Sequence, residues 1–177
     1  MKGIIFHIVE EVVTAKLGPE AWDALLTMTG LPGIYTSLGS YPDAELMALV
    51  DACAEMTGLE QADLLRMVGT DAIPLLYNRY PIFFEDAQNA RAFILSLNTI
   101  IHPEVRKLYA GAACPHFHFV ETGNTVTMGY DSPRRLCHLA HGFVLGLANH
   151  FEETIEIEHP ACMHSGAPMC HIKLVWK

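Results

Sequence analysis

The hydrophobic pattern of this chain changes period half-way along, and this change restricts the fold more than any other feature. In the first half, apolar residues recur every three or four positions, as they do on the buried face of an α-helix. In the second half they alternate with polar residues, for example in His116-Phe117-His118-Phe119-Val120, as they do in a half-buried strand. A chain with helices first and strands later belongs to the α+β class.

The first half of the chain is expected to be almost entirely helical. Ile5, Ile8 and Val12 belong to an apolar stripe that stops before Gly18-Pro19, where Pro19 suits the first turn of a second helix. Pro103 lacks a backbone donor and is expected to bend the last helix of this half. The helices expected are residues 5–17, 19–29, 43–57, 60–77 and 85–108.

Two hairpins are expected in the second half, with the first turn at Thr122-Gly123-Asn124. The paired strands are residues 116–120 with 125–130, and 154–159 with 170–176. One amphipathic helix, 133–150, lies between the hairpins. The fold class is therefore α+β, with a helical N-terminal half and a C-terminal half of long helices and a four-stranded antiparallel sheet.

Composition narrows the range of partners. Hydrophobic residues make up 51% of the 177 residues and charged residues 18%, a balance that indicates an internal cavity or a lipophilic ligand. The net charge of −9 argues against nucleic acid and anionic membranes as partners. No apolar run reaches roughly 18 residues, so no transmembrane helix is expected. The odd number of cysteines, 5, argues against a disulfide framework, and the reducing cytoplasm is the expected compartment.

The run Tyr130-Asp131-Ser132-Pro133-Arg134 places two hydroxyls and a guanidinium at the expected junction of a strand and a helix. In one interpretation it is a capped helix start, because Ser132 is a good N-cap and Pro133 suits the first helical position. In another, the hydroxyls, the fork-shaped cation and the positive end of the helix bind carboxylate or phosphate groups. The run alone does not choose between them.

His102 lies immediately before the bend expected at Pro103. Leu95, Asn98 and Val105 share its side of the helix, so its side chain is expected to face inward. A histidine on an apolar face is usually a hydrogen-bonded core residue. The functional alternative is an axial ligand to heme iron through a neutral ring nitrogen, with the anion-binding run holding the two propionates.

Three cysteines and one histidine in the last third are candidate metal ligands. Cys162 and Cys170 lie at the two sides of the expected second hairpin tip. His159 shortly precedes Cys162, and Cys137 lies on the preceding helix. These residue types suit a tetrahedral structural zinc site. The alternatives are buried free thiols or a Cys162–Cys170 disulfide.

The remaining histidines receive simpler interpretations. His116 and His118 alternate with Phe117 and Phe119, so they are expected on the opposite, solvated face of the hairpin. A His-x-His pair can also bind metal, but a solvated face is the interpretation adopted for it. No special role is expected for the histidines of the late helix, which are His138, His141 and His150.

Tyr130-x-Ser132-x-Arg134 together with His102 resembles the H-NOX family, the heme-nitric oxide/oxygen binding domains related to the sensor domain of soluble guanylate cyclase. The other segments that resemble it are the opening MKGIIF, the helix with Trp22, Leu97-Asn98-x-x-x-His102, and Pro115. The resemblance implies one heme-binding domain over residues 1–177. It implies a helical distal subdomain at 1–65, a proximal α/β subdomain at 66–177, and heme b buried between the two halves.

The resemblance also implies roles for individual residues. His102 would be the proximal iron ligand, and Tyr130, Ser132 and Arg134 would bind the propionates. Pro115 would pack against the porphyrin and distort it from planarity, unless it is simply a proline at the start of a strand.

Gas selectivity follows from the same resemblance. Oxygen-binding H-NOX members have a tyrosine five positions after the motif arginine, whereas this chain has Leu139, which cannot donate a hydrogen bond. Ile5 and Val9 are expected to complete an apolar distal wall. The chain is therefore expected to bind nitric oxide, and also carbon monoxide, while excluding oxygen.

A subset of bacterial H-NOX proteins carries a zinc site built from three cysteines and one histidine. The residues that match its order and spacing are Cys137, His159, Cys162 and Cys170. His164 and His171 remain competing ligands. Oxidation of the thiolates would release the metal, so the site is either structural or a redox switch.

The expected function is a gas sensor and not an enzyme. Nitric oxide weakens the His102–iron bond, and the resulting shift passes to a separate signalling protein. For stand-alone bacterial H-NOX proteins this partner is typically a histidine kinase or a diguanylate cyclase/phosphodiesterase. The alternative is a thiol/zinc redox sensor module in which heme is secondary. A zinc hydrolase is disfavoured, because four protein ligands leave no open position for a substrate water.

Overall fold

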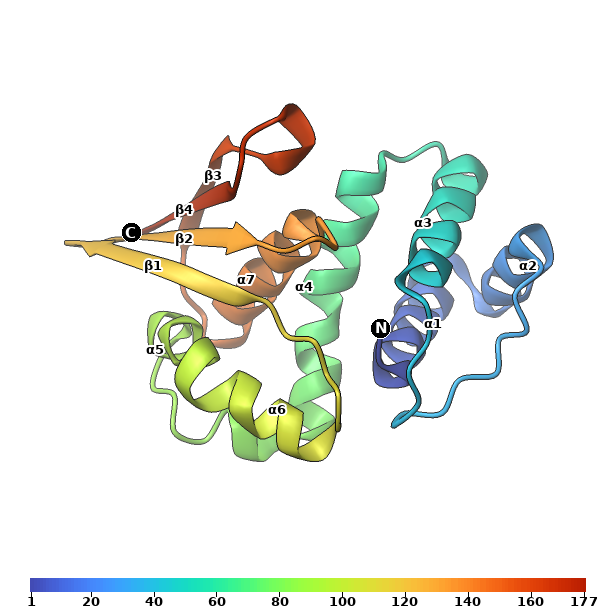
Figure 1. Cartoon of the computed structure of the whole chain (residues 1–177), viewed down its shortest axis with the longest axis horizontal. Helices are drawn as coiled ribbons and strands as arrows, with labels where there is room; N and C mark the ends of the chain where they lie inside the picture. Colours follow the sequence, from blue (N-terminus) through green and yellow to red (C-terminus); the bar gives the residue numbers. More distant parts are fainter.

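The computed structural model, which describes residues 1–177, places a group of helices on one side of a long central helix and a sheet on the other (Figure 1). The α-helices are α1 (Gly3–Leu17), α2 (Pro19–Thr29), α3 (Asp43–Thr57), α4 (Gln61–Arg79), α5 (Ala90–Ser96), α6 (His102–Leu108) and α7 (Cys137–His150). The strands are β1 (His116–Thr122), β2 (Thr125–Asp131), β3 (Ile155–Ala161) and β4 (Cys170–Trp176). The predicted α+β class is confirmed. None of the helices combines the length and the apolar character needed to cross a membrane.

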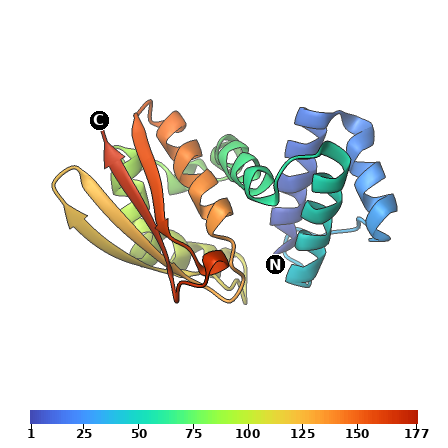
Figure 2. The ribbon, with the colours of Figure 1, turned by 90° about the horizontal axis from the view of Figure 1, so that it is seen from above.

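The N-terminal helices pack around a cluster of 22 buried residues. Phe6 from α1, Leu25 from α2 and Leu49 from α3 are each at most 1% exposed. Burying one such side chain contributes about 1.5–3 kcal/mol, so the apolar stripes seen in the sequence hold these short helices together. Figure 2 shows α1–α3 gathered on one side of α4 and the sheet on the other.

The four strands form one antiparallel sheet in the order β1-β2-β4-β3. Both predicted hairpins are present, and Gly123 adopts a φ of 59° in the first turn, a conformation that glycine takes without strain. The inward-facing residues join a second cluster of 17 buried residues, which α5 and α7 cover from one side. The residues of β2 and β4 that are at most 1% exposed are Val126, Met128, Cys170, Ile172 and Leu174.

Helices α4 and α7 touch backbone to backbone. A Cβ on Gly142 would lie 2.2 Å from the carbonyl oxygen of Arg66, and one on Gly69 would lie 2.4 Å from that of Leu139. Any side chain at these two glycines would push the helices apart. The contact fixes α7, and with it one wall of the cavity described below, against the central helix.

The segment expected as one helix over 85–108 is divided into three parts. Asn89 caps α5 by accepting a hydrogen bond from the Ala92 amide at 2.7 Å. A π-helical turn, Leu97–Ile101, follows, and in it the His102 amide donates to the carbonyl of Leu97. Pro103 then occupies the first turn of α6, where its missing donor is tolerated. The helix therefore has one wider, π-helical turn before Pro103. This π-turn, which ends at His102, stands in place of the predicted bend.

Helix α7 begins at Cys137 and not at residue 133, so the expected cap at Ser132 is wrong. Ser132 instead starts a turn, in which its carbonyl accepts from the Arg135 amide at 3.0 Å and its hydroxyl accepts from the Arg134 amide at 3.4 Å. Arg135 has a φ of 52°, which a right-handed helix cannot contain. The run Tyr130–Arg134 therefore lies at the end of β2 and in this turn.

Candidate functional site

A cavity of about 440 Å³ lies where α1, α4, α6, α7 and the first hairpin converge. Its walls are formed by 33 residues, of which 26 are hydrophobic. A volume of this size lies within the range of cofactor and small-molecule sites. The apolar excess of the composition is therefore concentrated around an internal space, as the sequence indicates.

Most of the residues singled out from the sequence surround this cavity. Those that line it are Ile5, His102, Pro115, Tyr130, Ser132, Arg134 and Leu139. Val9 does not line it. Val9 lies one turn further along α1, is 4% exposed and packs in the N-terminal cluster, while Ile4 takes the place beside Ile5 at the cavity wall. The α1 wall is therefore nearer the N-terminus than expected.

His102 is positioned by the π-turn and by β1. The side chain of Asn98, in the π-turn, accepts a hydrogen bond from the Phe117 amide at 3.1 Å and donates to the Phe117 carbonyl at 2.6 Å. The rings of His102 and Phe117 lie 5.8 Å apart between centroids. These contacts clamp the segment that carries His102 against the sheet.

The His102 imidazole is electrically neutral at neutral pH. Its pKa is lowered to about 4, chiefly by burial and then by the nearby positive charge of Arg106, and a hydrogen bond with the Pro115 backbone opposes this shift only in part. Its Nδ1 atom is buried without a hydrogen-bond partner. A neutral imidazole with an unsatisfied nitrogen is the form that ligates a metal ion.

Arg134 is held by two acceptors at the edge of the cavity. Its Nε donates to Asp43 Oδ2 at 2.7 Å, and its Nη1 donates to the Ala113 carbonyl at 2.7 Å. The amino group of Met1 bonds the other oxygen of Asp43 at 2.6 Å. Burial alone would raise the pKa of the Asp43 carboxyl, but hydrogen bonds from the Met1 amine and Arg134 outweigh it and lower the pKa. Asp43 thus joins the N-terminus, α3 and the Ser132–Arg135 turn.

Tyr130 and Ser132 are buried next to Arg134, at 3% and 7% exposure. The Tyr130 hydroxyl accepts a hydrogen bond from the Leu136 amide at 3.0 Å, which ties β2 to the start of α7. Hydroxyls at this depth, together with a guanidinium, form a polar corner in an otherwise apolar cavity. Such a corner suits the carboxylate ends of a mainly apolar ligand.

A pair of tyrosines was not foreseen from the sequence. Tyr80 and Tyr109 line the cavity, and their hydroxyls hydrogen bond to each other. Burial and the bond from Tyr80 raise the pKa of Tyr109, so its hydroxyl stays protonated. The two residues follow α4 and α6, and only the folded chain brings these helix ends together.

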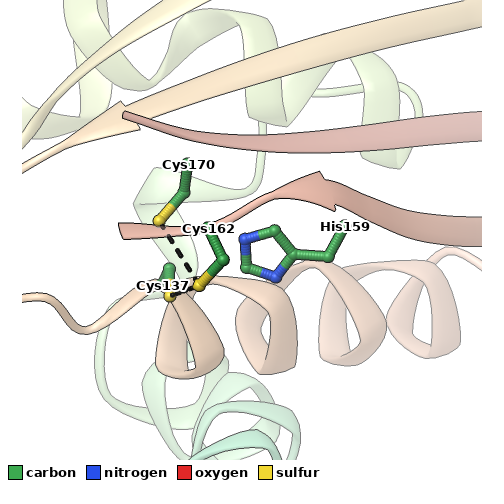
Figure 3. A group of neighbouring side chains, drawn as sticks. All are labelled: Cys137, His159, Cys162 and Cys170. Atoms are coloured by element: carbon green, nitrogen blue, oxygen red, sulfur yellow. Dashed lines mark hydrogen bonds between the residues drawn. The ribbon is translucent and has the colours of Figure 1, made fainter. Parts of the chain in front are cut away.

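The four candidate metal ligands meet at a single point (Figure 3). Cys137 begins α7, His159 lies in β3, Cys162 follows β3, and Cys170 begins β4. Their ligand atoms all lie within 4.8 Å of one another. Cys162 Sγ is 3.8 Å from the sulfur of Cys137 and 3.9 Å from that of Cys170. The thiols are all free, and His159 Nε2 is buried without a hydrogen-bond partner.

The competing histidines differ from His159 in their surroundings. The Nε2 atom of His164 lies 2.7 Å from the Arg135 carbonyl, which already engages it. His171 is exposed and points to the opposite face of the sheet from its buried neighbour Cys170. A second group, made by Cys137, His138 and His164, also has ligand atoms within 4.8 Å of one another, but the Arg66 guanidinium lies 3.1 Å from His138 Nδ1.

A family model described as Haem-NO-binding matches residues 2–159. The chain belongs to this family, also called H-NOX. H-NOX domains are heme-based gas sensors with the mixed helix and sheet architecture seen here. No curated protein sequence gives a significant match.

Solved H-NOX structures superpose over the whole chain. An H-NOX protein from S. oneidensis, crystallised in the Fe(II)NO ligation state, is 32% identical, covers 100% of this chain and 99% of its own, and has a TM-score of 0.94. The same domain in the Fe(II)CO ligation state, also 32% identical with coverage of 100% and 99%, has a TM-score of 0.91. An Fe(II) unliganded H-NOX protein from K. algicida is 29% identical, with coverage of 100% and 97% and a TM-score of 0.91.

Proposed function

We propose that this H-NOX domain is a heme-based nitric oxide sensor in which His102 is the axial ligand. The observation that carries the proposal is the neutral His102 imidazole, which lines an apolar cavity and has a buried nitrogen without a partner. When bound, heme b supplies a ferrous iron that takes up diatomic gases. The residues present fit this group, because they provide one nitrogen ligand, a large apolar space and a single polar corner.

Tyr130, Ser132 and Arg134 are the residues proposed to hold the two propionates. They lie together at the polar corner, and a guanidinium with two hydroxyls matches carboxylate geometry. Arg134 also pairs with Asp43. We therefore propose that Asp43 orients the guanidinium. Pro115, in the cavity wall near His102, is proposed to press on the face of the porphyrin.

The distal wall of the cavity, beside which the gas would bind, is proposed to exclude oxygen. Stable oxygen binding requires a hydrogen-bond donor beside the gas, whereas nitric oxide and carbon monoxide bind without one. Leu139 and Ile5 line the cavity and have no side-chain donor. The hydroxyls of Tyr80 and Tyr109 hydrogen bond to each other, so one of their two protons is already engaged.

Signalling is proposed to begin at the π-turn. Nitric oxide at the iron would weaken the His102–iron bond. Release of His102 would then remove one of the attachments that hold the π-turn and α6 beside β1. The two hydrogen bonds between the Asn98 side chain and the Phe117 backbone would then either resist the movement of this segment or pass it on to β1. Residues 1–65 are proposed to move against residues 66–177, with the Asp43–Arg134 ion pair between them. The proposed receiver is a separate histidine kinase or diguanylate cyclase/phosphodiesterase that recognises the acidic surface of a chain with a net charge of −9.

An absorption spectrum of the reduced full-length protein tests this proposal. We expect a Soret band that oxygen leaves unchanged and that nitric oxide moves to the position of a five-coordinate heme. A protein that takes up no heme, in cells or after reconstitution, would contradict the assignment of the cavity. A stable oxygen complex would contradict the role of Leu139 alone.

A second proposal concerns zinc, held by Cys137, His159, Cys162 and Cys170. In a tetrahedral site with zinc–sulfur bonds of about 2.3 Å, neighbouring sulfurs are about 3.8 Å apart. The two measured separations, 3.8 and 3.9 Å, agree with this value. Four protein ligands make the site structural and leave no place for a substrate water.

Metal analysis of the purified protein tests the zinc proposal, with one zinc ion per chain expected. The redox alternative predicts that an oxidant changes the output of a His102→Ala variant as strongly as that of the wild-type protein. An oxidant response that requires His102 would exclude that alternative.

A further inference from the structure

A group of histidines and one methionine lies on the face of the sheet that points away from the helices. His116 and His118 point outward from β1, because Phe117 between them is buried. Their rings meet edge to face, with centroids 5.3 Å apart. His171 points outward from β4, because the residues on either side of it are fully buried.

The register of the strands aligns two of these histidines across a gap. His118 of β1 pairs with Gly129 of β2, and Gly129 pairs in turn with His171 of β4. Residues that pair across neighbouring strands project from the same face, and strands lie about 4.8 Å apart. The two histidine backbones are therefore separated by about 10 Å, with no side chain between them. Two imidazoles turned toward each other could span that distance through one metal ion.

A thioether lies over the gap. Met169 and His171 are two residues apart along the chain. A Cβ on Gly129 would lie 3.1 Å from Met169 Sδ and 3.2 Å from the Cβ of His118. Gly129 is buried, although it belongs to the outward-facing row. The sulfur of Met169 is therefore the atom that covers Gly129 from the β4 side.

An acidic group extends the same patch. His116 pairs directly with Asp131 across β1 and β2, and both residues are exposed. The carboxylate adds a negative charge beside the imidazoles, which favours a cation.

We propose that this outer face binds one late transition-metal ion, with copper preferred, through His118, His171 and the Met169 thioether, with His116 as a further ligand. Imidazole suits copper, nickel and zinc, and soft sulfur ligands such as a thioether select Cu(I) and zinc. Copper also stands at the top of the affinity order for divalent ions at nitrogen sites.

The proposed site is separate from both sites described above. Phe117 faces the cavity and His102, whereas His116 and His118 face outward. Cys170 faces the inner Cys/His cluster, whereas His171 faces outward. An ion at one site can therefore be told from an ion at the other by single substitutions.

Calorimetric titration of the full-length, zinc-supplied protein with Ni(II) tests the proposal, because nickel is not reduced by the thiols. We expect one Ni(II) per chain, and a dissociation constant raised about tenfold or more by His118→Ala or His171→Ala. Thr127→Ala, which removes an outward-facing side chain two residues from Gly129, is the matched control and should leave the affinity unchanged. Met169→Leu should retain Ni(II), which the imidazoles hold, and should weaken the binding of copper supplied as Cu(I), for which the soft thioether is a ligand.

The location of the ion is read from amide NMR signals. Broadening by Ni(II) should be confined to residues 116–118, 129–131 and 169–171, and circular dichroism should show that the variants keep the sheet. Absence of Ni(II) binding, or binding that survives the His118→Ala/His171→Ala double variant, would overturn the proposal. Binding that is lost in Cys137→Ser but kept in the double variant would place the ion in the inner cluster instead, and would also overturn it.

Discussion

The cavity and the Cys/His cluster lie close together along α7, yet they differ in the number of potential ligand atoms and in the size of the space between them. Leu139 lines the cavity, and Cys137 belongs to the cluster only two residues earlier. The cavity offers one nitrogen ligand in a wide apolar space, whereas the cluster places four ligand atoms within 4.8 Å of one another. One arrangement leaves room beside a large group, and the other encloses a single ion.

This difference separates two kinds of function. In the cavity, the proposed selectivity depends on what the wall lacks, since the Leu139 side chain has no hydrogen-bond donor. In the cluster, binding depends on what is concentrated there, since each missing ligand leaves an incomplete tetrahedron. A substitution should therefore change gas chemistry at one site and fold stability at the other.

The largest effect is expected at His102. The variant His102→Ala should lose most of its bound heme or its five-coordinate ferrous spectrum, because no other imidazole lines the cavity. Added imidazole should restore the spectrum by entering the vacated space. His118→Ala, on the outer face of β1, is the control and should keep the wild-type spectrum. Unchanged heme binding and spectrum in His102→Ala would assign the ligand elsewhere.

At the cluster, Cys137→Ser should remove zinc and leave the heme spectrum nearly intact. An ion present at about 1,000 times its dissociation constant stabilises the folded state by about 4 kcal/mol, and this contribution should be lost. Denaturant unfolding with and without a chelator measures it. Cys53→Ala, in the helical core, should still respond to the chelator. If wild-type stability does not depend on zinc, the cluster is not a structural metal site.

The proposed oxygen exclusion should be reversible at one residue. In Leu139→Tyr, a phenol placed beside the gas should permit a stable oxygen complex. A hydrogen bond to a partly charged acceptor is worth about 1.5–3 kcal/mol, which corresponds to about a ten- to hundredfold gain in oxygen affinity. Leu139→Phe has the same ring without the hydroxyl and should gain nothing. Equal oxygen affinities in the two variants would show that the donor is not the deciding group.

The smallest effect is expected at the ion pair between the N-terminal helices and the cavity edge. Asp43→Asn should lower the free energy of unfolding by at most about 1 kcal/mol, because the carboxylate is partly exposed. The folded-state pKa of Asp43 lies below its ordinary value of 3.8, so its stabilisation is present above that pH and is lost as the pH falls further. Unfolding curves from pH 7 to pH 2 should converge for the wild type and the variant. The exposed, unpaired Asp23 offers Asp23→Asn as a control with little effect at any pH.

The sequence predicted the parts of this structure that depend on local periodicity. The alternation around Phe117 gave the correct hairpin and the correct outward direction of His116 and His118. The spacing of Cys162 and Cys170 gave a correct juxtaposition at the second hairpin tip. The first follows from the two-residue period of a strand and the second from the close approach of the two sides of a hairpin, and neither depends on distant contacts.

What the sequence did not predict depends on contacts between distant segments. Arg135 adopts a positive φ that only the surrounding packing maintains, so the start of α7 was misplaced. Asp43 lies 91 residues from Arg134, and no local pattern announces their ion pair. The Tyr80–Tyr109 bond likewise forms between two helix ends. Val9 was assigned to the cavity because periodicity identifies a buried face but not what that face contacts.

Resonance Raman spectroscopy of the ferrous protein tests the central claim most directly, because it reports the iron–histidine stretching vibration. The account predicts this band in the gas-free protein, its absence in His102→Ala and its disappearance when nitric oxide binds to the wild type. A band that is present in His102→Ala without added imidazole would contradict His102 as the ligand. A band that persists after nitric oxide binds would contradict release of His102 as the start of signalling.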